Sequence, residues 1–282
     1  MTTLFQSNTI VKGTELLALL TTINDKEKTW KDVDQEVVLD AMILHIGSPN
    51  SDLREMVYRS FYRSILNDQL DPQTLSKLLD YSVRHLLFKG IGESGTDSVF
   101  TRAFTTILIA VIINKDHDMD FLPKETLTEV KNEIKNYIEL EQDVRGYVPV
   151  KGWAHSIAHV ADTCDELIKS EKIDEVEYFS IVEILLKKYC TTPTAFVHGE
   201  DDRVVIAVLA MLKKEVGLEE LKLFVEGIPS LLKSQKEELS SEKYWFVMAN
   251  CNSILKSLYI GASNDPLYDS LQETIRKSLS KI

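Results

Sequence analysis

The residues of this chain whose types and spacing are best suited to chemistry are two histidines one helical turn apart. His155 and His159 stand at positions i and i+4, and Asp162 follows three residues later. On an α-helix these three side chains would share one face, where two imidazoles and a carboxylate could hold a divalent metal ion. No glutamate lies between the two histidines, so the pattern falls short of a complete metalloprotease signature.

The polar pattern around His155 and His159 also allows interpretations without a metal ion. It could bind a ligand, bond to polar groups of a neighbouring helix, or simply face water. Acid–base catalysis is a further option, because imidazoles titrate near neutral pH and Asp162 could orient one of them. If a metal ion is bound, Glu200 or Asp201 could add a ligand or act as the base for an activated water.

A helix that begins at Gly152 is expected to position these side chains, and Gly146 and Pro149 mark the turn before it. Its apolar stripe, at steps of four, three, four and three residues, consists of Trp153, Ile157, Val160, Cys164 and Leu167. The opposite face carries His155, His159, Asp162 and Glu166. The helix would therefore have one face for the core and one face that could do chemistry.

The rest of the chain also predicts helices, because glycine and proline are sparse, with 11 and 7 residues, and no stretch alternates like a strand. The expected helices span residues 14–24, 33–46, 53–66, 72–88, 98–113, 123–141, 173–189, 204–214, 219–224, 229–239, 244–259 and 266–279. The residues expected to cap helices include Asp52, Asp97 or Ser98, Asp201 or Asp202, and Ser240 or Ser241. Residues 115–120 are expected to form a connector.

Four of these expected helices have an arginine or a histidine near their start, and these four residues recur at similar intervals along the chain. Arg54, Arg102, His155 and Arg203 are spaced 48, 53 and 48 residues apart, and a fifth unit is expected near Lys243. Helix pairs that repeat every 40–50 residues or so are typical of HEAT and armadillo repeats. We therefore expect an all-α fold, a HEAT/armadillo-like α-solenoid of stacked helix pairs. Residues 1–282 would form a single domain of roughly five such units.

In a stacked array the second helices of the pairs line up on one side, usually the concave one. Arg54, Arg102, His155 and Arg203 would then form a ladder that could hold carboxylate or phosphate groups. The alternative is structural, because nearby acids could pair with these arginines between repeats. The candidate ligand-binding residues are Arg54, Arg102, Arg145, Trp153, His155, His159, Asp162, Asp201 and Arg203.

Composition restricts the partners that such a surface could have. The net charge of −12 argues against nucleic acid and against an anionic membrane surface. Cys164, Cys190 and Cys251 form no close pair, which is typical of reduced thiols in the cytoplasm. We see no signal peptide and no uncharged stretch of membrane-spanning length, and we assign no cofactor.

The stretches SDLREMVYRSF, DSVFTRAFTTIL, DVRGYVPVKGWAHSIAHVAD and HGEDDRVVIAV together carry a resemblance. The chain resembles an uncharacterised bacterial family, a domain of unknown function common in Firmicutes, with an RGYV-x-x-x-GWAH-x-x-AH-x-AD block and a later E-D-x-R block. The resemblance runs from about Asp52 to the end of the fourth unit. The positions that match its polar marks are Arg145, Gly146, Trp153, His155, His159, Asp162, Asp201 and Arg203. It implies a helical-repeat fold and a bacterial cytoplasmic setting, and no particular reaction.

Two functions of different classes follow from these patterns. The first is a non-catalytic binding or scaffold module, whose polar concave face holds an unknown protein or a small anionic ligand. The alternative is a metal-dependent hydrolase that uses His155, His159 and Asp162. Whether the chain is an enzyme is left open by the sequence.

Overall fold

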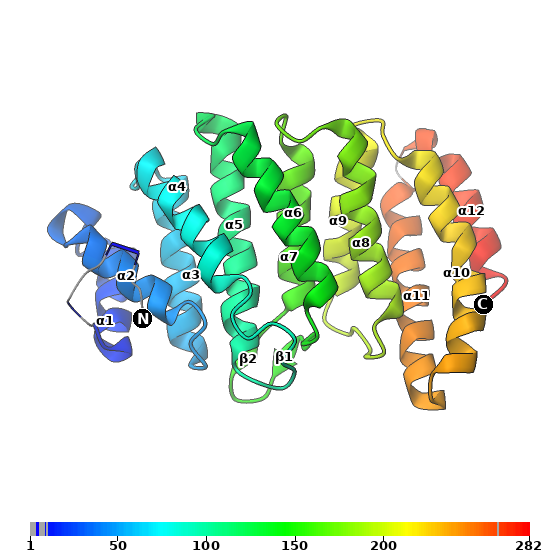
Figure 1. Cartoon of the computed structure of the whole chain (residues 1–282), viewed down its shortest axis with the longest axis horizontal. Helices are drawn as coiled ribbons and strands as arrows, with labels where there is room; N and C mark the ends of the chain where they lie inside the picture. Colours follow the sequence, from blue (N-terminus) through cyan, green and yellow to red (C-terminus); the bar gives the residue numbers. More distant parts are fainter. Residues whose placement is uncertain (1–3, 6–8, 10, 264) are drawn as a thin grey trace. The chain divides into compact units, whose positions relative to one another are not determined.

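The computed structural model describes residues 4–5, 9, 11–263 and 265–282, and these residues form an all-α fold, as predicted (Figure 1). The α-helices are α1 (Gly13–Asn24), α2 (Gln35–His45), α3 (Ser51–Leu66), α4 (Pro72–Tyr81), α5 (Ser98–Met119), α6 (Lys124–Leu140), α7 (Ser156–Lys169), α8 (Tyr178–Thr191), α9 (Glu200–Lys213), α10 (Leu218–Glu238), α11 (Ser241–Ala262) and α12 (Asp269–Leu279). Short helical turns are η1 (Trp30–Asp32), η2 (Ser82–Leu86), η3 (Glu175–Glu177) and η4 (Pro266–Tyr268).

The chain divides into two compact units. Unit 1 comprises Met1–Pro123 and Leu140–His159, and unit 2 comprises Lys124–Glu139 and Val160–Ile282. In unit 1, α3 packs against α1, α2 and α5, and α5 also contacts α4 and η2. In unit 2, α11 packs against α8, α9, α10 and α12, while α10 contacts α8 and α12. A single domain over residues 1–282 stays a prediction.

Helix α5 is the most deeply buried element of the chain. By length and composition alone it could cross a membrane, but 89% of its most apolar window is buried inside the protein. It also continues through the expected connector to Met119. Lys115 and Asp116 both have partners there, because Lys115 pairs with Asp68 and the Asp116 carboxylate accepts the backbone N–H groups of Phe121 and Leu122.

Local chemistry explains two further departures from the sequence prediction. Helix α3 begins at Ser51 because Asn50, rather than Asp52, caps it by accepting the Leu53 N–H at 2.9 Å. Helix α10 is continuous where a break was expected, with Pro229 in its interior. Proline removes one bond of the helix ladder, to the carbonyl four residues earlier. Ser278 of α12 donates to that carbonyl, of Val225, at 2.9 Å.

A small hairpin precedes α7 where the sequence predicted helix. Strand β1 (Tyr147–Val148) pairs antiparallel with β2 (Gly152–Trp153), with Tyr147 opposite Trp153. Val150, Gly152 and His155 have φ values of 70°, 76° and 52°, in the left-handed region that a right-handed helix excludes. The helix therefore begins only at Ser156, and Trp153 does not belong to its apolar stripe.

Candidate functional site

Arg54 fastens the hairpin to α3 from inside the protein. Its side chain is fully buried, and Nη1 donates to the carbonyl of Ser48 at 2.5 Å. Nη2 donates to the carbonyls of Lys151 at 2.6 Å and Trp153 at 3.1 Å. The guanidinium therefore holds both ends of β2 through the backbone, leaving the Lys151 and Trp153 side chains outside.

The Arg54 guanidinium is surrounded by aromatic rings. Its central carbon lies 4.1 Å from the ring centroid of Phe100 and 5.0 Å from that of Phe104, which is cation–π geometry. Burial lowers the pKa of Arg54, and the nearby carboxylates of Glu55 and Asp97 raise it by less. These contacts correct the prediction that Arg54 meets a ligand on an open face, because the group is enclosed.

Arg102 is enclosed in the same way. Its Nε and Nη2 donate to the Glu141 carboxylate at 2.6 and 2.8 Å, and both side chains are fully buried. Nη1 donates to the carbonyls of Lys89 and Gly90 and to the hydroxyl of Ser98. The predicted ligand contact at Arg102 is likewise corrected, because this arginine ties the loop before α5 to the segment that leads into the hairpin.

Arg145 completes this internal framework at its edge. Its Nε and Nη2 donate to the buried Asp143 carboxylate at 2.8 and 2.7 Å, and Nη2 also donates to the carbonyl of Thr96. The hydrogen bond with Asp143 raises the pKa of Arg145. Asp143 also accepts the Gly95 N–H at 2.9 Å, and its carbonyl accepts the Ser156 hydroxyl at 2.7 Å, which fixes the start of α7.

Lys151 adds an ion pair at the turn of the hairpin. Its Nζ lies 2.6 and 2.8 Å from the two carboxylate oxygens of Asp97. Asp97 was expected to cap α5, but its side chain makes no capping hydrogen bond and turns to the hairpin instead. Arg145 and Lys151 are therefore both paired with carboxylates.

The hairpin itself presents apolar side chains to solvent. Tyr147 is 50% exposed, Val150 96% and Trp153 40%. The Tyr147 and Trp153 rings meet edge to face with centroids 5.0 Å apart, and Trp153 stacks on His155 at 4.3 Å. We call Tyr147, Val150, Trp153 and His155 the hairpin surface. The apolar exposure of Tyr147 and Val150 was not anticipated, because the sequence suggested a helix start here.

His159 continues the aromatic contacts toward the core of unit 1. Its ring lies edge to face with His155, with centroids 5.9 Å apart, and edge to face with Phe104 at 5.2 Å. The structure therefore brings the two predicted imidazoles of unit 1 together. Both imidazoles pack against aromatic rings, and this environment suits packing and hydrogen bonding as well as it suits metal binding.

In unit 2, Asp162 and Arg203 form an ion pair between α7 and α9. Arg203 Nε donates to one carboxylate oxygen at 2.6 Å, and Nη2 contacts the other. Burial raises the pKa of Asp162, and the contacts with Arg203 act against this rise. The Asp162 carboxylate, which the metal hypothesis uses as a ligand, thus has a guanidinium partner. This pairing matches the structural alternative considered for the arginine ladder.

Asp201 links α9 to α11. The hydroxyls of Ser253 and Ser257 both donate to Asp201 Oδ2 at 2.6 Å. Burial raises the pKa of Asp201, but these hydrogen bonds and those from the backbone of Asp201 and Asp202 together outweigh it, so the pKa lies below its ordinary value. The side chain does not cap α9, whose N-cap is Gly199 in the left-handed region.

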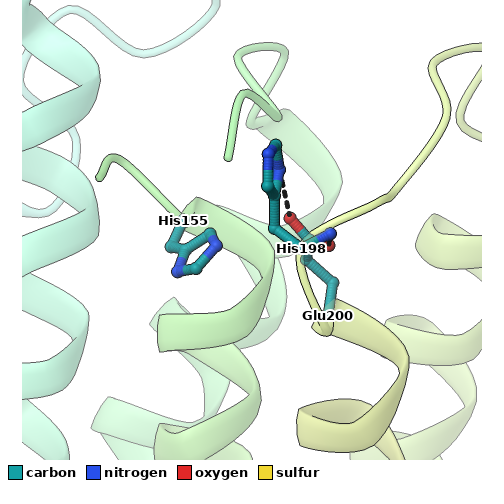
Figure 2. Close-up of side chains that lie close together, drawn as sticks. All are labelled: His155, His198 and Glu200. Carbon is teal, nitrogen blue, oxygen red and sulfur yellow. Dashed lines mark hydrogen bonds and ion pairs between the residues drawn. The ribbon is translucent and has the colours of Figure 1, made fainter. Parts of the chain in front are cut away.

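His198 and Glu200 lie beside each other at the start of α9, as Figure 2 shows. The His198 backbone N–H donates to Glu200 Oε2 at 2.8 Å, and His198 Nδ1 lies 3.8 Å from Oε1. Glu200 is buried, so its carboxylate is oriented by the loop that precedes the helix. Nothing in the sequence pattern singled out His198.

Residues 87–260 match the profile of a family described as a protein of unknown function, DUF2785. The chain belongs to the DUF2785 family. Comparisons with curated proteins and with solved structures found no match. The DUF2785 region contains the hairpin and the buried Arg102–Glu141 pair, whereas Arg54 lies outside it. The residues that hold the DUF2785 hairpin in place thus come partly from the segment that precedes the family region.

Proposed function

We propose that the protein is a non-catalytic binding module of the helical-repeat type, and that the hairpin surface is where a protein partner docks. The observation that carries this proposal is the display of exposed Tyr147, Val150 and Trp153 on a backbone held by the buried Arg54. An exposed apolar group on a rigid, internally bonded loop is typical of an interaction site.

The packing within each unit supports a HEAT- or armadillo-like arrangement. In unit 1, α3 contacts both α1 and α5, its next-but-one neighbours along the chain. In unit 2, α9 contacts α11, and α10 contacts both α8 and α12, while sequential neighbours such as α8 and α9 also pack together (Figure 1). Contacts to both the next helix and the one after it are what stacked helix pairs produce.

Backbone strain in the hairpin is evidence that its conformation serves a binding function. Val150 and His155 adopt left-handed φ values without being glycine, a conformation that costs of order 1 kcal/mol or more per residue. Val150 gains nothing from burial, because its side chain is almost completely exposed. Strained residues persist where the surrounding structure over-determines them, which is common at binding sites.

The charges near the hairpin favour an apolar contact over an anionic ligand at this surface. Arg145 is paired with Asp143, and Lys151 with Asp97, so the nearby cations are neutralised within the protein. The groups that a partner can still contact are the aromatic rings of Trp153 and Tyr147 and the side chain of Val150. Tryptophan and tyrosine are the residues that most often dominate binding energy in protein interfaces. The partner would therefore insert an apolar or aromatic side chain against Trp153.

The test compares two exposed tryptophans. Partners captured by the wild-type chain from cells that express it are measured quantitatively beside Trp153→Ala and Trp245→Ala, and the main partner is purified for titration. Trp245 is a matched control, because it is 62% exposed and lies in unit 2. We expect Trp153→Ala to weaken binding by about 2 kcal/mol or more and Trp245→Ala to leave it unchanged. Equal binding by all three chains would refute the hairpin as the docking surface.

The metal-dependent hydrolase remains the alternative proposal and has its own test. Protein purified without chelator is analysed for bound metal, and added Zn²⁺ and Mn²⁺ are titrated into wild type and into the His155→Ala/His159→Ala double variant. One ion per chain that is lost in the double variant would favour the hydrolase. The binding-module proposal expects no difference between the two proteins, because His155 stacks on Trp153 and Asp162 pairs with Arg203.

A further inference from the structure

A cavity of about 550 Å³ lies in unit 1, at the C-terminal ends of α1 and α3 and beside η1. Its volume is in the range of small-molecule sites. The residues that line it lie between Ile23 and Gln69, outside the family region and away in sequence from the hairpin.

The cavity is cationic in a chain that is strongly acidic. Its ionisable lining residues are Lys26, Lys28 and Arg63, and no Asp or Glu lines it. Within the part of the chain that the structure describes, no ion pair of 4.0 Å or less joins these three cations to a carboxylate, and Lys28 interacts with Asp32 only at longer range. Three cations that line one space repel one another, and an anion between them would be attracted to all three and would offset that repulsion.

Arg63 is held in position by neutral groups. Its Nη1 donates to the carbonyl of Asn24 at 3.2 Å and to the side-chain oxygen of Asn24 at 2.9 Å. The Asn24 amide in turn donates to the hydroxyl of Ser60 and the carbonyl of Leu20, both at 2.8 Å. These contacts fix one nitrogen of the guanidinium and leave its charge without a counterion.

The simplest structural explanation covers only part of this arrangement. Cations are favoured at helix C-termini, where carbonyl groups lack partners, and the bond from Arg63 to the Asn24 carbonyl at the end of α1 fits that explanation. It does not account for Lys26 and Lys28, which make no such bond among the described residues and line the cavity with Arg63.

We propose that this cavity binds a small phosphorylated molecule, with its phosphate between Arg63, Lys26 and Lys28. A guanidinium can contact two phosphate oxygens at once, and lysines add compact charges on flexible stems. The cavity also has an apolar part, because Trp30, only 4% exposed, and Ile23 line it, so it suits a ligand with an apolar portion beside its anion. This site is separate from the proposed docking function of the hairpin and does not depend on it.

Isothermal titration of the full chain tests the proposal, with inorganic pyrophosphate as the phosphate probe and citrate as a carboxylate probe of similar charge. The variants are Lys26→Gln/Lys28→Gln and Arg63→Gln. Lys31→Gln is the matched control, because Lys31 is an exposed lysine of the same segment that does not line the cavity. Thermal unfolding of each variant shows whether the fold is retained.

We expect pyrophosphate to bind the wild type more tightly than citrate. The lysine double variant should bind at least roughly tenfold more weakly, a typical loss for charge-assisted contacts, and Lys31→Gln should bind as the wild type does. Because the two lysines are exposed, the double variant should keep its fold, so it tests the site even if Arg63→Gln unfolds. Three results would overturn the proposal: no binding of pyrophosphate to the wild type, tighter binding of citrate, or an equal loss in Lys31→Gln.

Discussion

The guanidinium of Arg54 donates a hydrogen bond to the backbone carbonyl of Trp153, ninety-nine residues further along the chain. This bond joins α3 to the hairpin without using the indole of Trp153, which stays exposed and stacked on His155. A long-range contact of this kind gives a short hairpin the support that two-residue strands cannot supply for themselves. The exposed aromatic surface of the hairpin therefore depends on a side chain that is itself fully buried.

Replacing Arg54 with methionine should destabilise the protein and loosen the hairpin. The change leaves the carbonyls of Ser48, Lys151 and Trp153 without their donor, at a cost of about 3 kcal/mol in the free energy of unfolding. Urea unfolding measures this loss, and limited proteolysis reports on the hairpin. Arg59→Met is the control, because Arg59 is exposed on the same helix. Equal stability of the two variants would contradict the anchoring role.

Replacing Glu141 with glutamine should lower the free energy of unfolding by more than this small chemical change suggests. The substitution removes the charge that faces the fully buried Arg102 and leaves that guanidinium without its counterion. Breaking a buried ion pair on one side typically costs about 3–5 kcal/mol. The exposed Glu139→Gln serves as the control, and chemical denaturation compares the two. A loss below about 1 kcal/mol, as for a surface pair, would show that the Arg102–Glu141 contact is weak.

The pKa of Asp201 should make part of the stability of unit 2 depend on pH. Because hydrogen bonds from Ser253 and Ser257 hold the folded pKa below its ordinary value of 3.8, this contribution is complete above that value. It is lost as the pH falls through the lowered folded pKa. The variant Ser253→Ala/Ser257→Ala should therefore lose stability at pH 7, and the difference from wild type should shrink toward pH 2. A difference that stays constant across this range would mean that the two hydroxyls do not act through the ionised carboxylate.

A double-mutant cycle should show that Ser278 compensates for Pro229. Ser278→Ala leaves the buried Val225 carbonyl without a donor and should cost about 1–2 kcal/mol in the free energy of unfolding. With alanine at position 229 as well, the new backbone N–H can bond to that carbonyl within α10. The cost of Ser278→Ala should therefore be much smaller in the Pro229→Ala background. Additive effects of the two changes would rule out the compensation.

Much of the helical architecture could be predicted from the sequence because it rests on local signals. Apolar periodicity and sparse glycine and proline placed α1, α3, α9 and α11 within a few residues of their ends. Trp153 shows the limit, since its spacing to Ile157 and Val160 fits a helix, while the left-handed backbone at Val150 and His155 prevents one. Gly146 and Pro149 marked a turn here, but neither Val150 nor His155 is a glycine, so no local signal placed the left-handed backbone at these two positions.

The arginines show a second limit. Their repeated spacing led us to expect Arg54, Arg102 and Arg203 in one ladder at helix starts, but spacing does not determine which way a side chain turns. The acceptors that draw Arg54 inward are carbonyls near residue 151, and the acceptor of Arg102 is Glu141, 39 residues away. Partners this distant in sequence are brought together only by tertiary packing.

The burial of α5 also has a consequence for the fate of the unfolded chain. Helix α5 is long and apolar, and the surrounding helices bury 89% of its most apolar window. A chain that loses this packing exposes a continuous apolar segment of the kind that chaperones bind and that inserts into bilayers or aggregates. Each buried arginine contact that stabilises unit 1 therefore also lowers the fraction of chains that expose this apolar segment.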